Sequence, residues 1–97
     1  MSERNGTVVC PGTYDPVTNG HLDIITRTSN VFDKVVVGVV NNPLRKNKTL
    51  FSAEERKGFI ETATAELDNV EVQIFSTLLV EFARNNGAHA IVKGMRA

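Results

Sequence analysis

The sequence predicts an α/β fold built on a doubly wound parallel sheet. Short apolar, β-branched runs alternate along the chain with segments of helical spacing, a pattern typical of βαβ units with right-handed crossovers. The run Val35–Val40 is apolar without alternation, as expected for a strand that helices cover on both faces. The 97 residues, 41% of them hydrophobic, suffice for one compact domain over residues 1–97 and are too few for two.

The amino-terminal half predicts two strands joined by a helix. Thr7–Cys10 is apolar and stops at a Pro-Gly pair, which indicates a buried strand followed by a loop. A helix is expected over residues 19–32, where apolar residues recur near helical spacing at Leu22, Ile25 and Phe32. Val35–Val40 is the second strand, and the polar, proline-containing segment 41–50 is a loop.

The carboxyl-terminal half predicts two more helices and two more strands. The Ser-x-x-Glu pattern of Ser52 and Glu55 is a capping box, so a helix should run from there to about Leu67. Val70–Phe75 alternates apolar with polar residues and predicts a strand. A short helix follows, with one core-facing stripe, and Ala90–Val92 is the fourth strand. The stripe consists of Leu78, Leu79, Phe82 and Ala83.

Composition excludes several classes of function. Eleven Lys and Arg balance eleven Asp and Glu, so the basic footprint of a general nucleic-acid binder is missing. Cys10 is the single cysteine, which excludes an internal disulfide and suits a reducing compartment, so we expect the cytoplasm. No apolar stretch approaches the roughly 20 residues that span a bilayer, and Met1–Gly6 is too polar for a signal peptide. We therefore expect a soluble protein without membrane or nucleic-acid partners.

The loop after the first strand is the strongest candidate for a phosphate site. In parallel α/β sheets, ligands bind beyond the carboxyl ends of the strands. Gly12 and Gly20 would let a phosphate approach the backbone at the start of the helix, where unpaired N–H groups and the helix dipole favour anions. His21, in the first helical turn, could donate a hydrogen bond to a phosphoryl oxygen, and Thr13 could supply a hydroxyl. The alternative is a plain turn in which Thr18 or Asn19 caps the helix.

Basic residues follow two other strands of the predicted sheet. Arg45, Lys46 and Lys48 follow the second strand, and Lys93 and Arg96 follow the fourth. No acidic residue lies between Lys34 and Ala53 or after Glu81, whereas seven carboxylates lie in 54–81. This segregation of charge in a neutral chain predicts a crevice that selects anions. Solvated loop lysines remain the alternative for each residue taken alone.

Other candidates for chemistry are interpreted as structural. Cys10 ends an apolar strand, where packing is the usual role of a free cysteine, and Cys10 with His21 is too small a set for zinc. His89 has no obvious carboxylate partner nearby. Asp15, between Tyr14 and Pro16, is expected to organise the turn. The residues themselves therefore predict no metal site.

Four segments of the chain resemble a known family. Residues 11–21 read PGTYDPVTNGH, and FSAEER, FAR and IVKGMRA follow at 51–56, 82–84 and 91–97. The first segment is similar to the Thr/His-x-Gly-His region of the nucleotidyltransferase superfamily, in the form Pro-Gly-Thr-Phe-Asp-Pro-x-Thr-x-Gly-His of the bacterial phosphopantetheine adenylyltransferase family. The other three also resemble that family, in order and at similar spacing. The matches together cover essentially the whole chain.

The resemblance implies a Rossmann-like nucleotidyltransferase fold and a step of coenzyme A synthesis. ATP and 4′-phosphopantetheine would give dephospho-coenzyme A and pyrophosphate, reversibly and with Mg2+. In this family the acceptor phosphate attacks the α-phosphorus of ATP directly. Such a transfer needs positioning and charge stabilisation rather than a protein nucleophile. The family assembles as hexamers, so a homo-oligomer is expected.

The resemblance also implies roles for residues at the ATP side of the site. His21 would bind the α-phosphate and stabilise its transition state, and Thr13 would contact both ATP and the acceptor phosphate. Tyr14 would contribute its backbone to ATP binding. The resemblance also assigns the ATP phosphates and ribose to a segment near the end of the chain, made of Gly94, Met95 and Arg96.

On the acceptor side, the family places a lysine of the basic loop on phosphopantetheine. Lys46 fits that position best, with Arg45 and Lys48 left open because this loop is longer here. Leu79 matches a residue that lines the pantetheine arm. Lys93 stands where many members have an arginine against the acceptor phosphate; it keeps the charge and loses the bidentate fork.

The chain ends at Ala97, whereas members of the family continue, so it resembles their amino-terminal part. The missing sheet and helices should leave apolar surface exposed and favour association with another chain. Two alternative functions stay open. One is another nucleotidyltransferase, acting by cytidylyl transfer or by adenylyl transfer to a mononucleotide. The other is a half-domain that binds nucleotide without turnover.

Overall fold

The computed structural model describes residues 6–41 and 49–93, and it confirms the predicted α/β class. Strands and helices alternate along the chain as the hydrophobic spacing predicts. Every predicted element is present, with small differences at the ends. The elements are β1 (Thr7–Gly12), α1 (Asn19–Ser29), β2 (Lys34–Val40), α2 (Ala53–Ala63), β3 (Val70–Phe75), α3 (Leu79–Asn85) and β4 (Ala90–Ile91).

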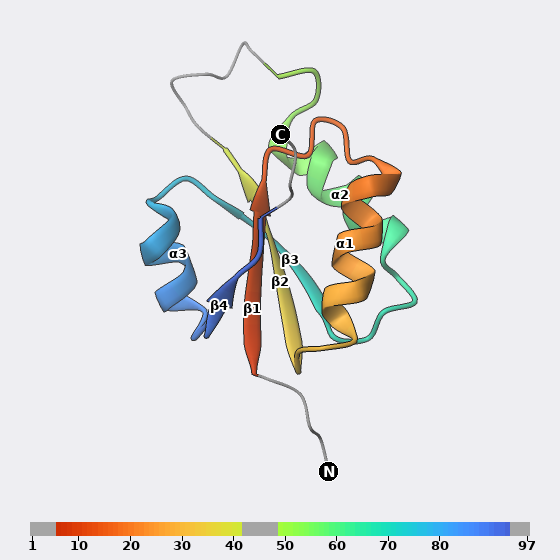
Figure 1. Ribbon diagram of the computed structural model, residues 1–97. Coiled ribbons are helices and arrows are strands. Elements are labelled where there is room, and N and C mark those ends of the chain that lie inside the picture. Colours follow the sequence, from red (N-terminus) through yellow and green to blue (C-terminus); the bar gives the residue numbers. More distant parts are fainter. Residues whose placement is uncertain (1–5, 42–48, 94–97) are drawn as a thin grey trace.

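The described strands form one parallel sheet in the order β3-β2-β1-β4. Helices α1 and α2 lie on one face of the sheet and α3 lies on the other (Figure 1). The chain passes from β1 through α1 to β2, whereas α3 carries it back across the sheet to β4, on the other side of β1. The winding therefore reverses at β1, which is where a doubly wound sheet opens a ligand crevice.

The two faces of the sheet carry separate apolar clusters. The larger one packs alternate residues of β1 and β2, such as Val8 and Val37, against Ile25 of α1 and Ile60 of α2. On the other face, the remaining β-residues pack against α3, through Val9, Val36, Phe75, Phe82 and Ala83. Burial on both faces explains why β2 has no polar alternation in the sequence.

Both longer helices begin with a capping box. Ser52 caps α2, and Glu55 is its reciprocal partner, as the sequence predicts. Thr18 caps α1, and its partner at the third helical position is His21 rather than the usual Glu or Gln. His21, the candidate phosphate-binding residue, is therefore part of the capping box of its own helix.

The predicted carboxyl-terminal ends of the two longer helices are wrong. Helix α1 ends at Ser29 and α2 at Ala63, not near 32 and 67. The apolar residues that prolong the helical spacing, Phe32 and Leu67, do pack against the core, but from the turns that follow the helices. At the end of α2, the Thr64 hydroxyl donates to the carbonyl of Ile60 (2.8 Å).

The strand ends and one core residue also differ from expectation. Strand β1 continues to Gly12 because its ladder with β2 continues, and β4 stops at Ile91 although the Val92 N–H still donates to the Val9 carbonyl (2.9 Å). The prediction that Leu78 belongs to the core stripe is wrong. Leu78 is the N-cap of α3, in extended backbone, and is 72% exposed.

Candidate functional site

An open cleft of about 800 Å³ lies at the carboxyl ends of the strands. Its lining comes from the loop after β1, the first turns of α1, the ends of β2 and β3, the start of α3 and the segment after β4. The sequence predicts these strand ends as the place of the site. The lining residues are Cys10, Pro11, Gly12, Thr13, Tyr14, Thr18, Gly20, His21, Ile24, Val40, Phe75, Leu79, Val92 and Lys93.

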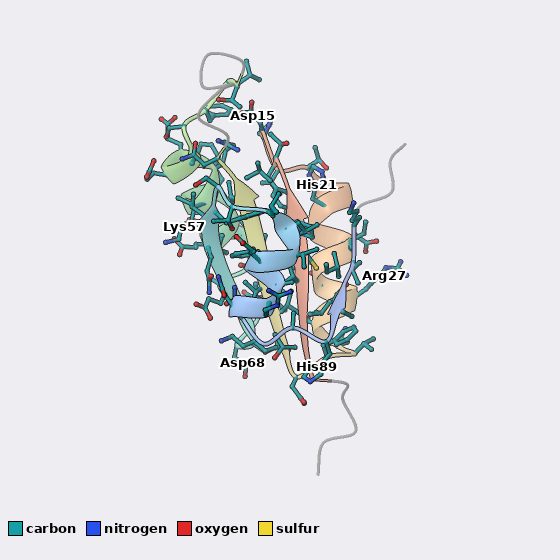
Figure 2. The ribbon with its side chains drawn as sticks, turned by 90° about the vertical axis from the view of Figure 1, so that its left-hand side faces the viewer. Asp15, His21, Arg27, Lys57, Asp68 and His89 are labelled. Atoms are coloured by element: carbon teal, nitrogen blue, oxygen red, sulfur yellow. The ribbon has the colours of Figure 1, made fainter. Side chains whose placement is uncertain are left out.

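The predicted site residues within the described ranges gather in this cleft. Thr13, Tyr14 and His21 lie at its β1–α1 side, and Leu79 and Lys93 line it from α3 and from the end of β4. Figure 2 shows His21 near the same end of the molecule as Asp15, whereas Asp68 and His89 lie at the opposite end. The other candidates lie outside the described residues, namely Lys46 with Arg45 and Lys48, and Gly94, Met95 and Arg96.

The capping box determines which nitrogen of His21 can donate. The Thr18 backbone N–H donates to Nδ1 of His21 (2.9 Å), and the Thr18 hydroxyl lies 3.1 Å from the same nitrogen. A backbone N–H can only donate, so Nδ1 must be the acceptor and the neutral ring carries its proton on Nε2. The Thr18 hydroxyl in turn accepts from the His21 backbone N–H (3.3 Å). Helix capping thus leaves a fixed N–H donor on a ring that lines the cleft.

Tyr14 supports the same ring from the loop. Its ring meets that of His21 edge to face, with 4.9 Å between centroids. Its hydroxyl donates to the Cys10 carbonyl (2.9 Å), and burial raises the pKa of that hydroxyl well above its usual range. The backbone of Tyr14 has φ of 52°, in the left-handed region. The ring also covers Gly12, where a Cβ would lie 3.0 Å from it, so glycine is needed there for close packing.

Two charged side chains hold this loop against the start of α2. The Asp15 carboxylate accepts from the backbone N–H groups of Leu50 and Phe51, the latter at 2.9 Å. Arg56 donates from one terminal nitrogen to the carbonyls of Thr13 (2.8 Å) and Val40 (2.9 Å). Asp15 therefore organises more than its own turn, because it reaches a segment 35 residues further along the chain. The spacing of the residues does not predict this role for Arg56, which stands in a run of charged residues typical of a solvated helix face. Its one signal is that the FSAEER segment, which ends at Arg56, is among those that resemble the family.

The electrostatic character of the cleft suits an anion. Lys93 is in the lining, and no carboxylate is among the described lining residues. The described ranges also contain no group of three or more His, Cys, Asp or Glu side chains that could hold a metal ion. The cleft can therefore offer N–H donors, hydroxyl groups and positive charge to a phosphorylated ligand.

Four branched aliphatic or aromatic lining residues are absent from the predicted site: Ile24, Val40, Phe75 and Val92. For Val40, Phe75 and Val92 a signal exists, because each is the last residue of a predicted strand. Ile24 has none, since it is one of several apolar residues in the α1 pattern. These side chains add an apolar wall to the cleft, suited to an uncharged part of a ligand.

Cys10 also borders the cleft, but it is 2% exposed, and burial raises the pKa of its thiol to about 11. We expect the folded chain to be alkylated at neutral pH about a hundredfold more slowly than an exposed thiol, because the reactive thiolate is that much rarer. Since the folded state holds this proton more tightly, the thiol's contribution to stability should fall as the pH rises from about 9 towards 11. Mass spectrometry after timed labelling measures the rate. Labelling in urea is the control, and equal rates in both states would contradict the prediction.

No helix in the described part of the chain is both long and apolar enough to cross a membrane.

The chain is similar to a family and to individual proteins that share this architecture. The cytidylyltransferase-like family matches residues 9–97. A phosphopantetheine adenylyltransferase from Rubrobacter xylanophilus is 56% identical over 89 residues, and one from Clostridium tetani is 54% identical over 89. These matches cover 92% of this chain and 53% and 54% of the two relatives. The chain therefore spans about half the length of the curated relatives it matches.

Among solved structures, the fold is similar to that of a bifunctional NMN adenylyltransferase/ADP ribose pyrophosphatase from Francisella tularensis. The TM-score is 0.69 at 24% identity, covering 97% of this chain and 32% of that one. At this level of identity the likeness supports the fold and does not bear on the substrate. The expected nucleotidyltransferase architecture is confirmed by this similarity and by the family match.

Proposed function

The chain belongs to the cytidylyltransferase-like family, and on that premise we propose that it carries the adenylyl-transfer site of a phosphopantetheine adenylyltransferase. The proposed reaction joins ATP and 4′-phosphopantetheine to give dephospho-coenzyme A and pyrophosphate. The observation that carries the proposal is His21, which lines the cleft while its Nδ1 accepts from Thr18. Its Nε2–H is left as a donor that has no partner among the described residues. The choice of reaction is supported by two relatives named phosphopantetheine adenylyltransferase, which are 56% and 54% identical to this chain over 89 residues.

The proposed chemistry is a direct displacement at phosphorus. An oxygen of the acceptor phosphate forms a bond to the α-phosphorus of ATP, the bond from that phosphorus to the bridging oxygen breaks, and pyrophosphate leaves with the electron pair. Negative charge develops on the oxygens around the α-phosphorus. A positioned donor such as His21 Nε2–H would stabilise that charge in the transition state.

The other cleft residues support the two substrates. Thr13 would contact both ATP and the acceptor phosphate from the β1–α1 loop, and the backbone of Tyr14 would meet ATP. Lys93 would neutralise the acceptor phosphate, and Leu79 would pack against the pantetheine arm, next to the apolar wall that includes Phe75. Lys46, Gly94, Met95 and Arg96 belong to the proposal by resemblance and lie outside the described residues.

The proposed cofactor is Mg2+. The described part of the cleft does not fit a protein-held magnesium site, because no Asp or Glu side chain is among its described lining residues. Mg2+ would therefore enter bound to the triphosphate of ATP, since it is commonly held by substrate phosphates, waters and few protein groups. We also propose that the enzyme acts in the cytoplasm. Several copies would assemble into an oligomer, as the hexamers of the resembled family do.

Pyrophosphate release by the purified 97-residue chain, with ATP, Mg2+ and 4′-phosphopantetheine, is the test. We expect release that depends on the acceptor and falls when CTP replaces ATP or nicotinamide mononucleotide replaces the acceptor. Preference for CTP or for the mononucleotide would favour a different nucleotidyltransferase. ATP binding in a melting assay without pyrophosphate release would favour the half-domain that only binds; a ligand at 100 times its Kd should stabilise the fold by about 2.7 kcal/mol.

A further inference from the structure

Arg56 is a buried cation beside the cleft. It lies in the first turn of α2 and is 2% exposed. Its Nε donates to the carbonyls of Phe51 (3.1 Å) and Ser52 (3.3 Å), in addition to the bonds from its terminal nitrogen to Thr13 and Val40. All four acceptors are backbone carbonyls. Within the described part of the chain, no carboxylate is paired with it.

The burial of the Arg56 charge costs more free energy than a contact that only holds two segments together would require. Burying a charged group without an opposite charge is costly, even when its N–H groups are hydrogen-bonded. The start of a helix adds to that cost, because the helix dipole there repels a cation. An uncharged side chain could bridge neighbouring carbonyls at lower cost, as Asn69 does at the opposite end of the sheet. Hydrogen bonding to carbonyls therefore does not by itself explain why a charged side chain stands at this position.

The contacts of Arg56 point to the phosphate side of the cleft. Strands β1 and β2 pair as far as Gly12 and Val39, and the next residues, Thr13 and Val40, share the Arg56 terminal nitrogen. The guanidinium thus bridges β1 and β2 just beyond the last residue pair of their ladder, where the two strands separate. Both Thr13 and Val40 line the cleft. The positive charge therefore lies one hydrogen bond behind the cleft wall.

We propose that Arg56 is a positioning residue for ATP, which fixes the Thr13 loop beside the end of β2 and places a buried positive charge behind the phosphates. The inference rests on the proposed function, since ATP is the anion it names. The charge acts through the low-dielectric wall, where solvent screens it little. The hydrogen bonds act by holding the loop in the conformation that receives the phosphates, so that less ordering is needed on binding.

The test is the affinity for Mg-ATP, measured by calorimetry on four chains at a temperature where circular dichroism shows each to be folded. Arg56→Met removes the charge and the donors, and Arg56→Lys keeps the charge with fewer donors. Asn69→Ala is the matched control, because it removes side-chain bonds to the carbonyls of Ser29 and Phe32 away from the cleft. We expect about tenfold weaker binding for Arg56→Met, an intermediate loss for Arg56→Lys, and wild-type affinity for Asn69→Ala.

A purely structural role would give a different pattern. In that case the folded Arg56→Met chain would bind ATP like the wild type, or Asn69→Ala would lose as much affinity as the Arg56 variants, and either result overturns the inference. If Arg56→Met does not fold, the Mg-ATP affinities of Arg56→Lys and Asn69→Ala are compared instead, and equal affinities overturn the inference. A wild-type chain that binds no ATP would contradict the proposed function as well, and this is seen before any variant is compared.

Discussion

Replacing His21 with alanine is expected to slow the proposed adenylyl transfer about a hundredfold, equivalent to a loss of about 3 kcal/mol of transition-state stabilisation. The variant loses the Nε2–H donor that the capping box leaves free on the wall of the cleft. Because the charge on the α-phosphoryl oxygens grows towards the transition state, the loss should appear mainly in kcat rather than in KM. Steady-state pyrophosphate release by both chains measures it.

A matched pair of substitutions separates the two nitrogens of His21. Glutamine can place an N–H donor near the position of Nε2 without the acceptor at Nδ1, whereas asparagine can offer an acceptor near Nδ1 and no donor at Nε2. We expect His21→Asn to be as slow as the alanine variant and His21→Gln to retain part of the rate. Thermal melting of each chain controls for the lost half of the capping box. Wild-type turnover in the alanine or asparagine variant would contradict the assigned role.

Replacing Gly38 with valine should destabilise the fold by about 3 kcal/mol or more, although its neighbours in β2 are valines and valine favours strands. Gly38 lies on the face of the sheet that packs against α3. A Cβ there would come 2.6 Å from Phe82 and 3.0 Å from Phe75. Those two rings are stacked, with centroids 4.2 Å apart, so neither can move without disturbing the other. Urea denaturation measures the change in the free energy of unfolding.

Gly58 provides the control for this prediction. It lies within α2, and among the described residues no atom beyond its chain neighbours and its own helix backbone is within 4 Å of the position that its Cβ would take. Gly58→Ala should therefore stabilise the chain by about 0.5 to 1 kcal/mol, because alanine is the better helix former. A Gly38→Val chain as stable as the wild type would show that α3 does not hold the two rings over β2.

The kinds of element, and their order, could be predicted from the sequence because hydrophobic spacing and capping patterns are local. Ser52 and Glu55, which form a capping box within four residues, predict the start of α2. Val70–Phe75 is a strand with the bounds that its alternation predicts. The ends of α1 and α2 could not be predicted. Phe32 and Leu67 continue the apolar spacing, and only the packed structure shows that they reach the core from turns.

The candidate site divides along the same line. The loop after β1 and the first turn of α1 could be predicted to carry Thr13 and His21 from the amino-acid pattern alone, because strand, loop and helix start are contiguous there. The spacing also places Lys93 just after the fourth strand, at the predicted crevice. The packed structure was needed to show that Ile24 lines the cleft and that Arg56 turns inward to a carbonyl 43 residues away. Such features escape prediction because burial and hydrogen bonds between distant segments depend on the crossovers that bring those segments together, and short-range spacing does not encode those crossovers.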